Sequence, residues 1–392
     1  MMKKKQKIKV LFRHRSMEMG GVEKVLLSML NHLDREKFDL QLCLNLFQGE
    51  LRNEIPDFVP FKTLASGKED FSKNPLVNKF QLAARAIKLW LYRKFPFIPD
   101  YFILKNDADI EIATGYTMFS DVLNSSNKKS KKIGWFHSDI TSKGLQPILP
   151  KLLNEISKFD YFIFGSQQAH DSFVTHFPNE KLPPNSVILN AIPIDEIKAK
   201  ASEFIPEKDN IPTFTSVGRL HNRKGYHLLA EAHKKLLDDG FKHKIYIIGD
   251  GEERQNLEYQ IKNSGIQNSF ILLGTLMNPY PYVKNSDFYI MPSRSEGWPL
   301  IIAETLILQK PIIATAVGGI PEMITHKKNG YLVEYKTESI YDGMKKFLTN
   351  QDLLRQIREG LTHSEEQFDN RKIFNEVENI IESLYKEKTQ LC

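Results

Sequence analysis

Short apolar runs alternate with longer amphipathic segments along the first half of the chain. Runs of strand length occur at Lys7–Arg13, Phe38–Leu46, Ile110–Thr114, Ile133–His137, Asp160–Gly165 and Val187–Asn190. Apolar residues at helical spacing lie between them, notably in Val22–Leu33 and Pro75–Phe95. Strands that alternate with helices are typical of parallel βαβ units, so an α/β fold is predicted.

The same alternation resumes after a polar, proline-bounded stretch at Pro206–Pro212, which we interpret as a linker. The apolar runs here are Thr213–Val217, Lys244–Ile248, Phe270–Gly274, a run ending at Met291, Pro311–Thr315 and Tyr331–Val333. A last helical pattern covers Arg371–Lys388. The pattern predicts domains at 1–205 and 206–365, followed by a C-terminal helix within 366–392.

Length and composition are compatible with this division. A chain of 392 residues is long enough for two or three domains with sizeable cores. The two cysteines, Cys43 and Cys392, have no Cys-x-x-Cys neighbour, so neither a disulfide nor a structural zinc is expected. No apolar run reaches the roughly 18 residues that span a bilayer, and the lysine-rich start leads into a strand. We expect a cytoplasmic protein whose mild net charge of +6 does not indicate nucleic acid.

One loop between a strand and a helix carries candidate chemistry. The residues from Pro292 to Gly297 are polar and turn-rich, and helical spacing follows from Pro299 to Leu308. In parallel sheets, ligands bind beyond the carboxyl ends of the strands, where this loop must lie. The unpaired N–H groups and positive dipole at the start of the helix suit a phosphate or a sugar hydroxyl. An anion or sugar site is therefore expected here.

Two carboxylates frame this helix start, Glu296 in the loop and Glu304 about two turns into the helix. The carboxylate pair of a glycoside hydrolase lies roughly 5–9.5 Å apart. Eight helical residues rise about 12 Å, so hydrolysis by this pair is disfavoured. An alternative interpretation is that Glu296 only caps the helix and that Glu304 is a solvated side chain. On spacing alone, this is as good as a functional role for the pair.

The residues around these two carboxylates form a motif that resembles one in a known family. A Glu is followed after seven residues by a second Glu, then by a strand ending in Ala-Thr and by the turn Val317-Gly-Gly-Ile-Pro-Glu322. This resembles the donor-site signature of the retaining family 4 glycosyltransferases, of the bacterial surface-polysaccharide type. The resemblance implies the GT-B fold, two doubly wound Rossmann-like domains facing each other across a cleft. The first would bind the acceptor, the second would bind the donor, and the C-terminal helix would return to the first.

The resemblance also implies roles for single residues of the donor domain. Glu296 would contact the transferred sugar and act in catalysis, and Glu304 would bind the nucleotide ribose. The backbone of Leu273 and Gly274 would meet the base. The sugar and phosphates would be held by four residues of the turn, Gly297, Trp298, Pro299 and Leu300.

A second constellation in this domain is the loop Gly218-Arg219-Leu-His-Asn-Arg-Lys224-Gly225. A diphosphate leaving group carries about two negative charges, and without a metal it needs fixed cations and N–H groups. Arg219 and Lys224 match the family's Gly-Arg and Lys-Gly motifs, with Arg223 as a substitute. No metal or cofactor is therefore expected, and a solvated basic loop is the alternative.

The first domain carries weaker signals. The pair Gly20-Gly21 opens a helix after the first strand, and by resemblance it lies beside the donor diphosphate. His137 ends a strand where family members place a histidine near the donor sugar, so we count it as a catalytic candidate. Asp107 and Asp109 precede a strand instead of ending one, so we interpret them as an entry turn and not as a metal-binding motif.

A basic segment with interleaved aromatic residues lies in the same domain. Between residues 73 and 105 a single acid, Asp100, stands against Lys73, Lys79, Arg85, Lys88, Arg93, Lys94 and Lys105. A basic amphipathic helix can lie on an anionic membrane surface. The alternative is a helix packed on the sheet with a solvated basic face.

Together these features predict a retaining glycosyltransferase. It would move a sugar from a nucleotide-diphosphate sugar, most commonly UDP-linked in this family, to a hydroxyl of a glycan acceptor. A lipid-linked surface-polysaccharide precursor at the inner face of the cell membrane is the expected acceptor. The alternatives are a nucleotide-sugar epimerase or a phosphorylase of related fold, or a non-catalytic nucleotide-sugar-binding subunit.

Overall fold

The computed structural model describes residues 6–142, 144–207, 210–368 and 370–390. The chain divides into two units, one formed by residues 1–191 with 370–392 and the other by residues 192–369. The division lies at 191/192, before the expected linker at Pro206–Pro212, part of which is outside the described residues together with Cys392.

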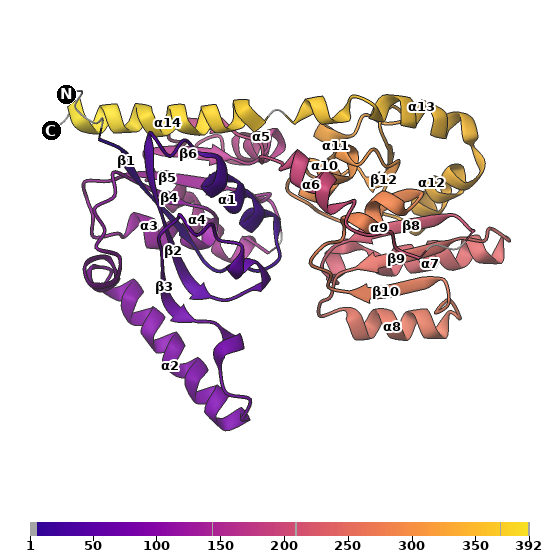
Figure 1. The fold of residues 1–392 in the computed structure, drawn as a ribbon, viewed down its shortest axis with the longest axis horizontal. Helices are drawn as coiled ribbons and strands as arrows, with labels where there is room; N and C mark the ends of the chain where they lie inside the picture. Colours follow the sequence, from indigo (N-terminus) through magenta and orange to yellow (C-terminus); the bar gives the residue numbers. More distant parts are fainter. Residues whose placement is uncertain (1–5, 143, 208–209, 369, 391–392) are drawn as a thin grey trace. The chain divides into compact units, whose positions relative to one another are not determined.

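The first unit is built on a seven-stranded parallel sheet in the order β3-β2-β1-β4-β5-β6-β7 (Figure 1). Its strands are β1 Ile8–His14, β2 Phe38–Phe47, β3 Phe61–Ser66, β4 Ile110–Ala113, β5 Lys131–Phe136, β6 Tyr161–Phe164 and β7 Asn185–Val187. Its α-helices are α1 Gly21–His32, α2 Pro75–Lys94, α3 Phe119–Leu123, α4 Leu149–Ile156, α5 Gln167–His176 and α14 Asn370–Gln390. Short helical turns lie at η1 Glu50–Asn53, η2 Lys68–Asp70, η3 Pro99–Leu104, η4 Tyr116–Met118 and η5 Gln146–Ile148.

The second unit has a six-stranded parallel sheet in the order β10-β9-β8-β11-β12-β13. Its strands are β8 Thr213–Val217, β9 Lys244–Ile248, β10 Phe270–Gly274, β11 Phe288–Met291, β12 Ile312–Thr315 and β13 Tyr331–Val333. Its helices are α6 Ile194–Lys200, η6 Asn222–Lys224, α7 Tyr226–Asp238, α8 Arg254–Asn263, α9 Tyr280–Asn285, α10 Leu300–Ile307, α11 Ile320–Met323, α12 Thr337–Thr349, α13 Gln351–Leu361 and η7 Ser364–Gln367.

The predicted α/β class and the parallel strands are confirmed, with two local corrections. The strand expected at Val187–Asn190 lies at Asn185–Val187, and Ile188 adds only one further hydrogen bond, from its N–H to the Phe164 carbonyl. The strand Phe61–Ser66 was not predicted. Its first two residues are exposed, and it pairs only at the edge of the sheet, so it lacks a continuous apolar run.

Each sheet has a switch point, where successive connections leave in opposite directions. In the first unit β1 lies between β2 and β4, and in the second β8 lies between β9 and β11. Ligands of open α/β sheets bind beyond the carboxyl ends of such a strand pair. The loops after β1, β4, β8 and β11 are therefore the places where functional side chains are expected.

A buried ion cluster joins β1 and β4 in the first unit. The Arg13 guanidinium donates to Glu111 at 2.9 Å and to Asp100 at 2.6 Å, and Lys132 also contacts Glu111. Burial alone would raise the pKa of the Glu111 carboxyl, but the charges of Arg13 and Lys132 outweigh it and lower that pKa to about 2. The cluster fixes the two strands that flank the switch point.

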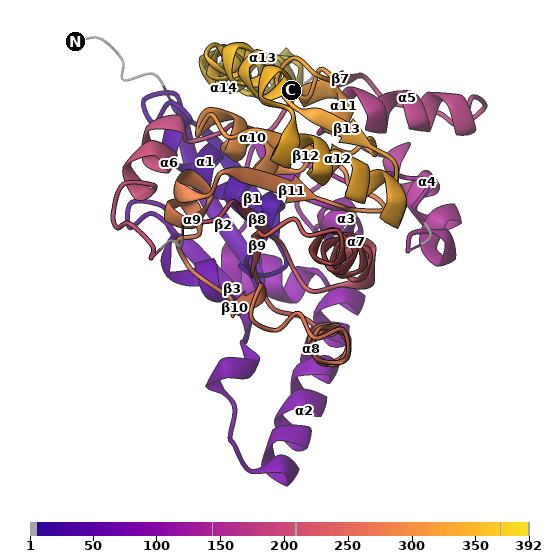
Figure 2. The same ribbon diagram turned by 90° about the vertical axis from the view of Figure 1, so that its right-hand side faces the viewer.

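Helix α14 packs against the first unit, whereas helix α2 projects from it. Phe374, Val377 and Ile381 of α14 are buried, and Lys37 donates to Glu378 at 2.9 Å. In contrast α2 has no buried residue and extends beyond the rest of the unit in both views (Figures 1 and 2). Among the described residues, no helix combines the length and apolar character needed to cross a bilayer.

Candidate functional site

Glu296 is a buried carboxylate held by two cations at the switch point of the second sheet. It follows β11, and its partners end the loop that follows β8. Lys224 Nζ lies 2.8 Å from Glu296 Oε1, and an Arg223 nitrogen lies 3.0 Å from Oε2. Burial by itself would raise the pKa of the Glu296 carboxyl, but the charges of Lys224 and Arg223 outweigh it and hold that pKa below its ordinary value.

Backbone contacts lock these two loops together. The N–H of Arg294 donates to the Arg223 carbonyl at 2.7 Å, and the Arg223 side chain donates to the Ser295 carbonyl at 3.0 Å. Gly225 has φ 71°, and a Cβ there would lie 2.0 Å from the Pro292 carbonyl oxygen. Only glycine permits both this left-handed conformation and this approach, so the Lys224-Gly225 pair is a geometric requirement of the site.

A third loop, after β12, supports Glu296 from its backbone. Gly318 has φ 56°, and a Cβ there would lie 1.9 Å from the Glu296 carbonyl oxygen. The N–H of Gly319 donates to the Gly297 carbonyl at 2.6 Å. The Trp298 side chain is buried against Phe368, with ring centroids 6.1 Å apart. The Trp298 indole therefore packs in the core, and its Nε1 has no hydrogen-bond partner among the described residues.

Helix α10 begins at Leu300, with Pro299 at the N-cap and no side-chain acceptor. This leaves the first N–H groups of the helix without a side-chain cap. One turn further, Glu304 is only 2% exposed, so the alternative of a solvated Glu304 is wrong. Burial, followed by the charge of Glu304, raises the pKa of the neighbouring Tyr280. The two predicted carboxylates thus bracket the start of one helix, each in its own buried setting.

The other predicted donor residues lie further from Glu296. The side chain of Arg219 is 73% exposed and approaches Glu252 at 3.4 Å, whereas Arg223 occupies the place beside Glu296. Leu273 is half-buried at the end of β10. Gly274 has φ 75°, and its carbonyl already accepts the N–H of Gly249 at 2.8 Å. A base in this place would therefore rely on other backbone groups of this segment.

The candidates of the first unit lie at the carboxyl edge of its sheet. His137 follows β5 and stacks on Trp135, with ring centroids 5.4 Å apart. Burial, with a smaller effect of His14, lowers the pKa of His137 to about 3, so its imidazole is neutral at pH 7. Gly20 is the N-cap of α1, with φ −153°, and Gly21 is the first helical residue. A Cβ at Gly20 would meet only the flexible Glu23 carboxylate, at 2.3 Å.

Three further residues meet at this edge and were not predicted. His14 Nδ1 lies 2.7 Å from Thr114 Oγ1, and His14 Nε2 lies 3.4 Å from Glu23 Oε1. His14 ends β1 and Thr114 follows β4, so this contact marks the switch point. The signal was available, because a polar residue at the end of a strand is the feature that singled out His137.

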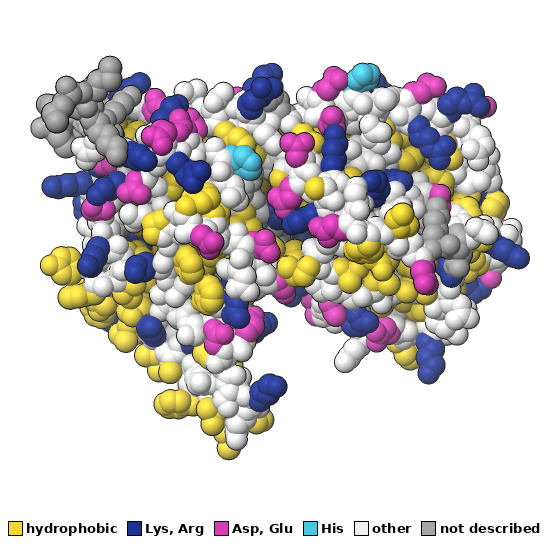
Figure 3. Space-filling view, viewed as in Figure 1, with side chains coloured by type: hydrophobic (Ala, Val, Ile, Leu, Met, Phe, Trp, Pro, Cys, Tyr) yellow, Lys and Arg dark blue, Asp and Glu magenta, His cyan; other side chains and the backbone are white. Residues whose placement is uncertain are grey.

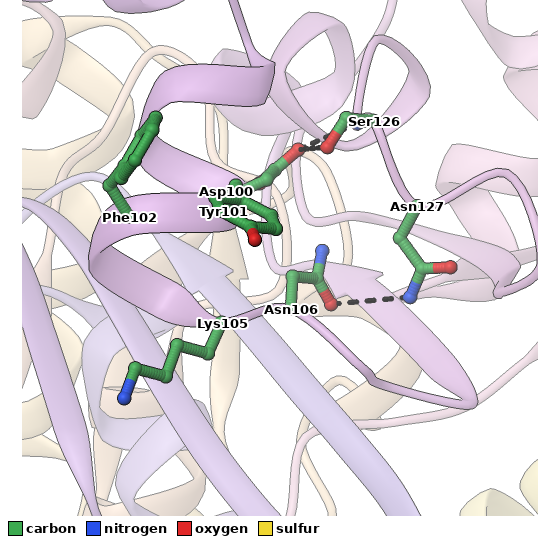
Figure 4. Close-up of a pocket in the computed structure, with 7 residues that line it drawn as sticks. All are labelled: Asp100, Tyr101, Phe102, Lys105, Asn106, Ser126 and Asn127. Carbon is green, nitrogen blue, oxygen red and sulfur yellow. Dashed lines mark hydrogen bonds between the residues drawn. The ribbon is translucent and has the colours of Figure 1, made fainter.

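A hollow of about 590 Å³ lies at the opposite edge of the sheet, before β4 and β5 (Figure 4). Its polar groups are largely engaged with one another. Asp100 accepts the N–H of Ser126 at 2.7 Å, and the Asn127 amide donates to Asn106 at 3.4 Å. Nearby, Asp107 contacts Lys9, and Asp109 accepts the Lys9 N–H at 3.0 Å. Both aspartates precede β4, as the entry-turn interpretation expects.

The second unit is similar to a known family of proteins. The sequence model described as glycosyl transferases group 1 matches residues 195–362. An uncharacterized glycosyltransferase of Methanocaldococcus jannaschii is 28% identical over 257 residues, which cover 62% of each chain. A Campylobacter jejuni enzyme named N-acetylgalactosamine-N,N'-diacetylbacillosaminyl-diphospho-undecaprenol 4-alpha-N-acetylgalactosaminyltransferase is 27% identical over 366 residues, 91% of this chain and 95% of that one.

A solved structure extends the likeness to both units. Anabaena HepE in complex with UDP-glucose has a TM-score of 0.73 and 18% identity, covering 96% of this chain and all of that one. At this identity the likeness establishes the fold. The expected GT-B architecture of two doubly wound domains is therefore confirmed.

Replacing Lys224 with Met tests the ion cluster. The Glu296 carboxylate would keep only Arg223, and removing a partner from a buried ion pair typically costs about 3 kcal/mol of unfolding free energy. In the wild type the folded pKa of Glu296 lies below the unfolded value, so the cluster stabilises above about pH 4.3 and this contribution is lost as the pH falls. The variant raises that pKa, so its deficit should be smaller at pH 5 than at pH 7.

Urea unfolding at both pH values measures this deficit. Lys234→Met is the matched control, because it removes a lysine from an exposed ion pair with Asp238 and should leave stability nearly unchanged. Combining Lys224→Met with Glu296→Gln should recover most of the loss at pH 7. A deficit that does not change with pH, or is not recovered by Glu296→Gln, would contradict this account of the cluster.

Proposed function

From the premise that the second unit of this GT-B chain is a group 1 glycosyltransferase domain, we propose that the enzyme transfers a sugar with retention from a UDP-sugar to a hydroxyl of a lipid-linked glycan. The observation that carries the proposal is Glu296, held as a carboxylate by Lys224 and Arg223 beside the start of α10. An ionised carboxylate accepts hydrogen bonds from sugar hydroxyls, and adjacent cations suit a diphosphate.

The diphosphate would be bound by fixed cations and N–H groups. Lys224 and Arg223 supply two positive charges, one of which Glu296 balances, and the start of α10, which has no side-chain cap, lies at the positive end of the helix dipole. The exposed Arg219 is a third cation, tied only loosely to Glu252. Charges fixed in advance stabilise the developing negative charge of a leaving group without reorganisation. These groups make transfer without a metal ion the expected chemistry.

The reaction itself needs no protein nucleophile. Both oxygens of Glu296 are engaged by cations, and its lowered pKa keeps it from donating a proton. We assign Glu296 to the hydroxyls of the transferred sugar. The bond from the anomeric carbon to the phosphate oxygen breaks, the bond to the acceptor oxygen forms on the same face, and the acceptor proton passes to the leaving phosphate. His137, neutral at pH 7, would donate or accept a hydrogen bond without adding charge.

The remaining donor contacts follow from the same resemblance. Glu304 would accept hydrogen bonds from the ribose hydroxyls, and backbone groups of the segment around Leu273 and Gly274 would contact the base. Gly20 and Gly21 would allow the diphosphate to approach the start of α1. The choice of UDP is supported by Anabaena HepE, which was solved with UDP-glucose. A lipid-diphosphate acceptor is supported by the Campylobacter relative, whose name specifies a diphospho-undecaprenol substrate.

Helix α2 supports a location at a membrane surface. At 3.6 residues per turn, Leu76, Phe80, Ile87 and Trp90 form one stripe, and these side chains are 80%, 75%, 59% and 57% exposed. Apolar side chains line this projecting helix and its free end in Figure 3. The helix has no Asp or Glu, and Lys79, Lys88 and Lys94 flank or join the stripe. An apolar stripe with basic flanks is complementary to an anionic bilayer.

The first prediction concerns donor binding. Glu304→Ala should weaken UDP binding by about 1.5–3 kcal/mol, the scale of a hydrogen bond to a charged group. Glu304→Gln retains the side-chain shape and should lose a similar amount because the charge is gone. Calorimetry measures both, with Glu258→Ala as the control because Glu258 is exposed on α8. Unchanged UDP affinity in a folded Glu304 variant would remove the ribose assignment.

The second prediction concerns metals. Release of UDP from a UDP-sugar, in the presence of a polyprenyl-diphosphate-linked sugar, should continue at an unchanged rate in excess EDTA, because Lys224, Arg223 and Arg219 together with the start of α10 balance the charge of the diphosphate. Lys224→Gln should lower this rate at least tenfold. Activity that is abolished by EDTA and restored by Mn²⁺ would point to a metal-bound diphosphate. Binding of UDP without any turnover would favour a non-catalytic subunit.

The third prediction concerns the membrane. The wild type should co-sediment with vesicles that contain phosphatidylglycerol and not with pure phosphatidylcholine, and binding should fall with salt. The variant Lys79→Gln, Lys88→Gln, Lys94→Gln should bind about 100-fold more weakly, since each of the three lysines contributes about 1 kcal/mol. Three exposed lysines elsewhere, Lys158, Lys181 and Lys262, changed to Gln form the matched control. Equal loss in both variants would show that net charge, and not α2, causes the binding.

A further inference from the structure

A groove of about 510 Å³ lies in the first unit between α2 and the carboxyl edge of the sheet. Helix α2 forms one wall, and the opposite wall is formed by the loop after β1, by β2 and η4, and by α3, η5 and α4. Four cations line this groove, Arg15, Arg85, Arg93 and Lys151, against a single carboxylate, Glu155.

The cations come from three separate segments and are only partly neutralised. Among the described residues no carboxylate lies within ion-pair distance of Arg15. Arg85 donates only to neutral oxygens, those of Gln48 and Ser66, both at 3.3 Å. Arg93 reaches Asp121 at 3.4 Å, and Lys151 reaches Glu155 at 3.7 Å. Like charges that gather around one hollow repel one another unless an anion enters it.

The same groove has an extensive apolar lining. Its apolar side chains are Leu46, Leu82, Ala86, Leu89, Ile148 and Leu152. On α2 the groove residues Leu82, Arg85, Leu89 and Arg93 recur at helical spacing, so they share one face of the helix. This face is opposite the exposed stripe of Leu76, Phe80, Ile87 and Trp90. A ligand of this groove is therefore amphiphilic, with a multiply charged anionic part and an apolar part.

We propose that this groove binds the diphosphate of an amphiphilic acceptor, with its arginines on the phosphate oxygens and its apolar wall on the adjoining hydrocarbon. Planar guanidinium groups bind phosphate oxygens in pairs, so Arg15, Arg85 and Arg93 fit this role. The inference rests on the proposed function, in which the acceptor is lipid-linked, and it adds the site that recognises the anionic linkage. The exposed stripe of α2 faces the bilayer that supplies the hydrocarbon chain.

The position of the groove connects it to the reaction. Arg15 comes directly after His14 at the end of β1, and Tyr116 and Thr117, which also line the groove, follow Thr114 after β4. An acceptor held by its diphosphate here lies beside the switch point of the first sheet, where ligands of such sheets bind. The enzyme would thus recognise the charged linkage independently of the sugar that receives the transfer.

Calorimetry with farnesyl diphosphate, below its micelle concentration and without vesicles, tests the proposal. Saturating UDP and EDTA are present, so that the donor site is occupied and no metal bridges the phosphates. The wild type should bind farnesyl diphosphate, and Arg15→Gln, Arg85→Gln, Arg93→Gln should weaken this binding at least tenfold. The variant Lys79→Gln, Lys88→Gln, Lys94→Gln loses the same charge from the rest of α2 and should remain within twofold of the wild type.

Inorganic diphosphate tests whether the groove recognises an amphiphilic diphosphate or a free one. It should bind at least fivefold more weakly than farnesyl diphosphate because it lacks the apolar part. Arg15→Gln alone removes an exposed, unpaired side chain, so it keeps the fold and should still weaken binding at least threefold. Equal losses in the two triple variants, equal affinity for the two probes, or no binding to the wild type would each overturn the proposal. Stabilisation of the same variants by UDP, measured separately, reports on the proposed function and not on this groove.

Discussion

Burying the Glu296 carboxylate sets the constraint on which the second unit depends. An ionised carboxylate out of contact with water is costly unless it is paired and hydrogen-bonded. Lys224 and Arg223 supply that pairing, and both come from the loop after β8. The loops after β8, β11 and β12 must therefore approach at backbone distance, and they do so through Gly225 and Gly318. Glycines that appear to be simple turn residues are consequences of one buried charge.

The first unit follows the same design with other residues. The buried cluster of Arg13, Asp100 and Glu111 fixes β1 against β4, and just beyond it His14 contacts Thr114. The buried ion cluster thus lies next to titratable groups at the carboxyl edge of the sheet. Burial keeps His137 neutral at pH 7, so this edge offers hydrogen bonds, whereas the second unit offers fixed charge at Glu296.

Much of the fold could be predicted from the sequence because buried parallel strands are nearly continuous apolar runs. The strand Phe61–Ser66 was not predicted, because an edge strand with exposed residues is not a continuous apolar run. Glu296, Glu304 and Lys224 could be proposed as site residues because their motifs have fixed spacing, and the structure brings Lys224 to 2.8 Å from Glu296. The placement of Arg223 beside Glu296 could not be predicted, because the η6 turn between Arg219 and Lys224 decides which arginine faces the carboxylate. The order of residues in the sequence does not determine how this turn orients the two arginines.

Helix α2 shows how one charge run can divide into two surfaces. In the sequence its five cations form a single basic segment without an acid. Wound at 3.6 residues per turn, the segment places Arg85 and Arg93 on the groove, and Lys79, Lys88 and Lys94 around the rest of the helix. Arginine has a fixed fork that matches phosphate oxygens, whereas lysine is a flexible, strongly hydrated point charge suited to a diffuse anionic surface. The division of residue types between the two faces fits the proposed roles, in which one side of the helix binds a specific anion and the other rests on a bilayer.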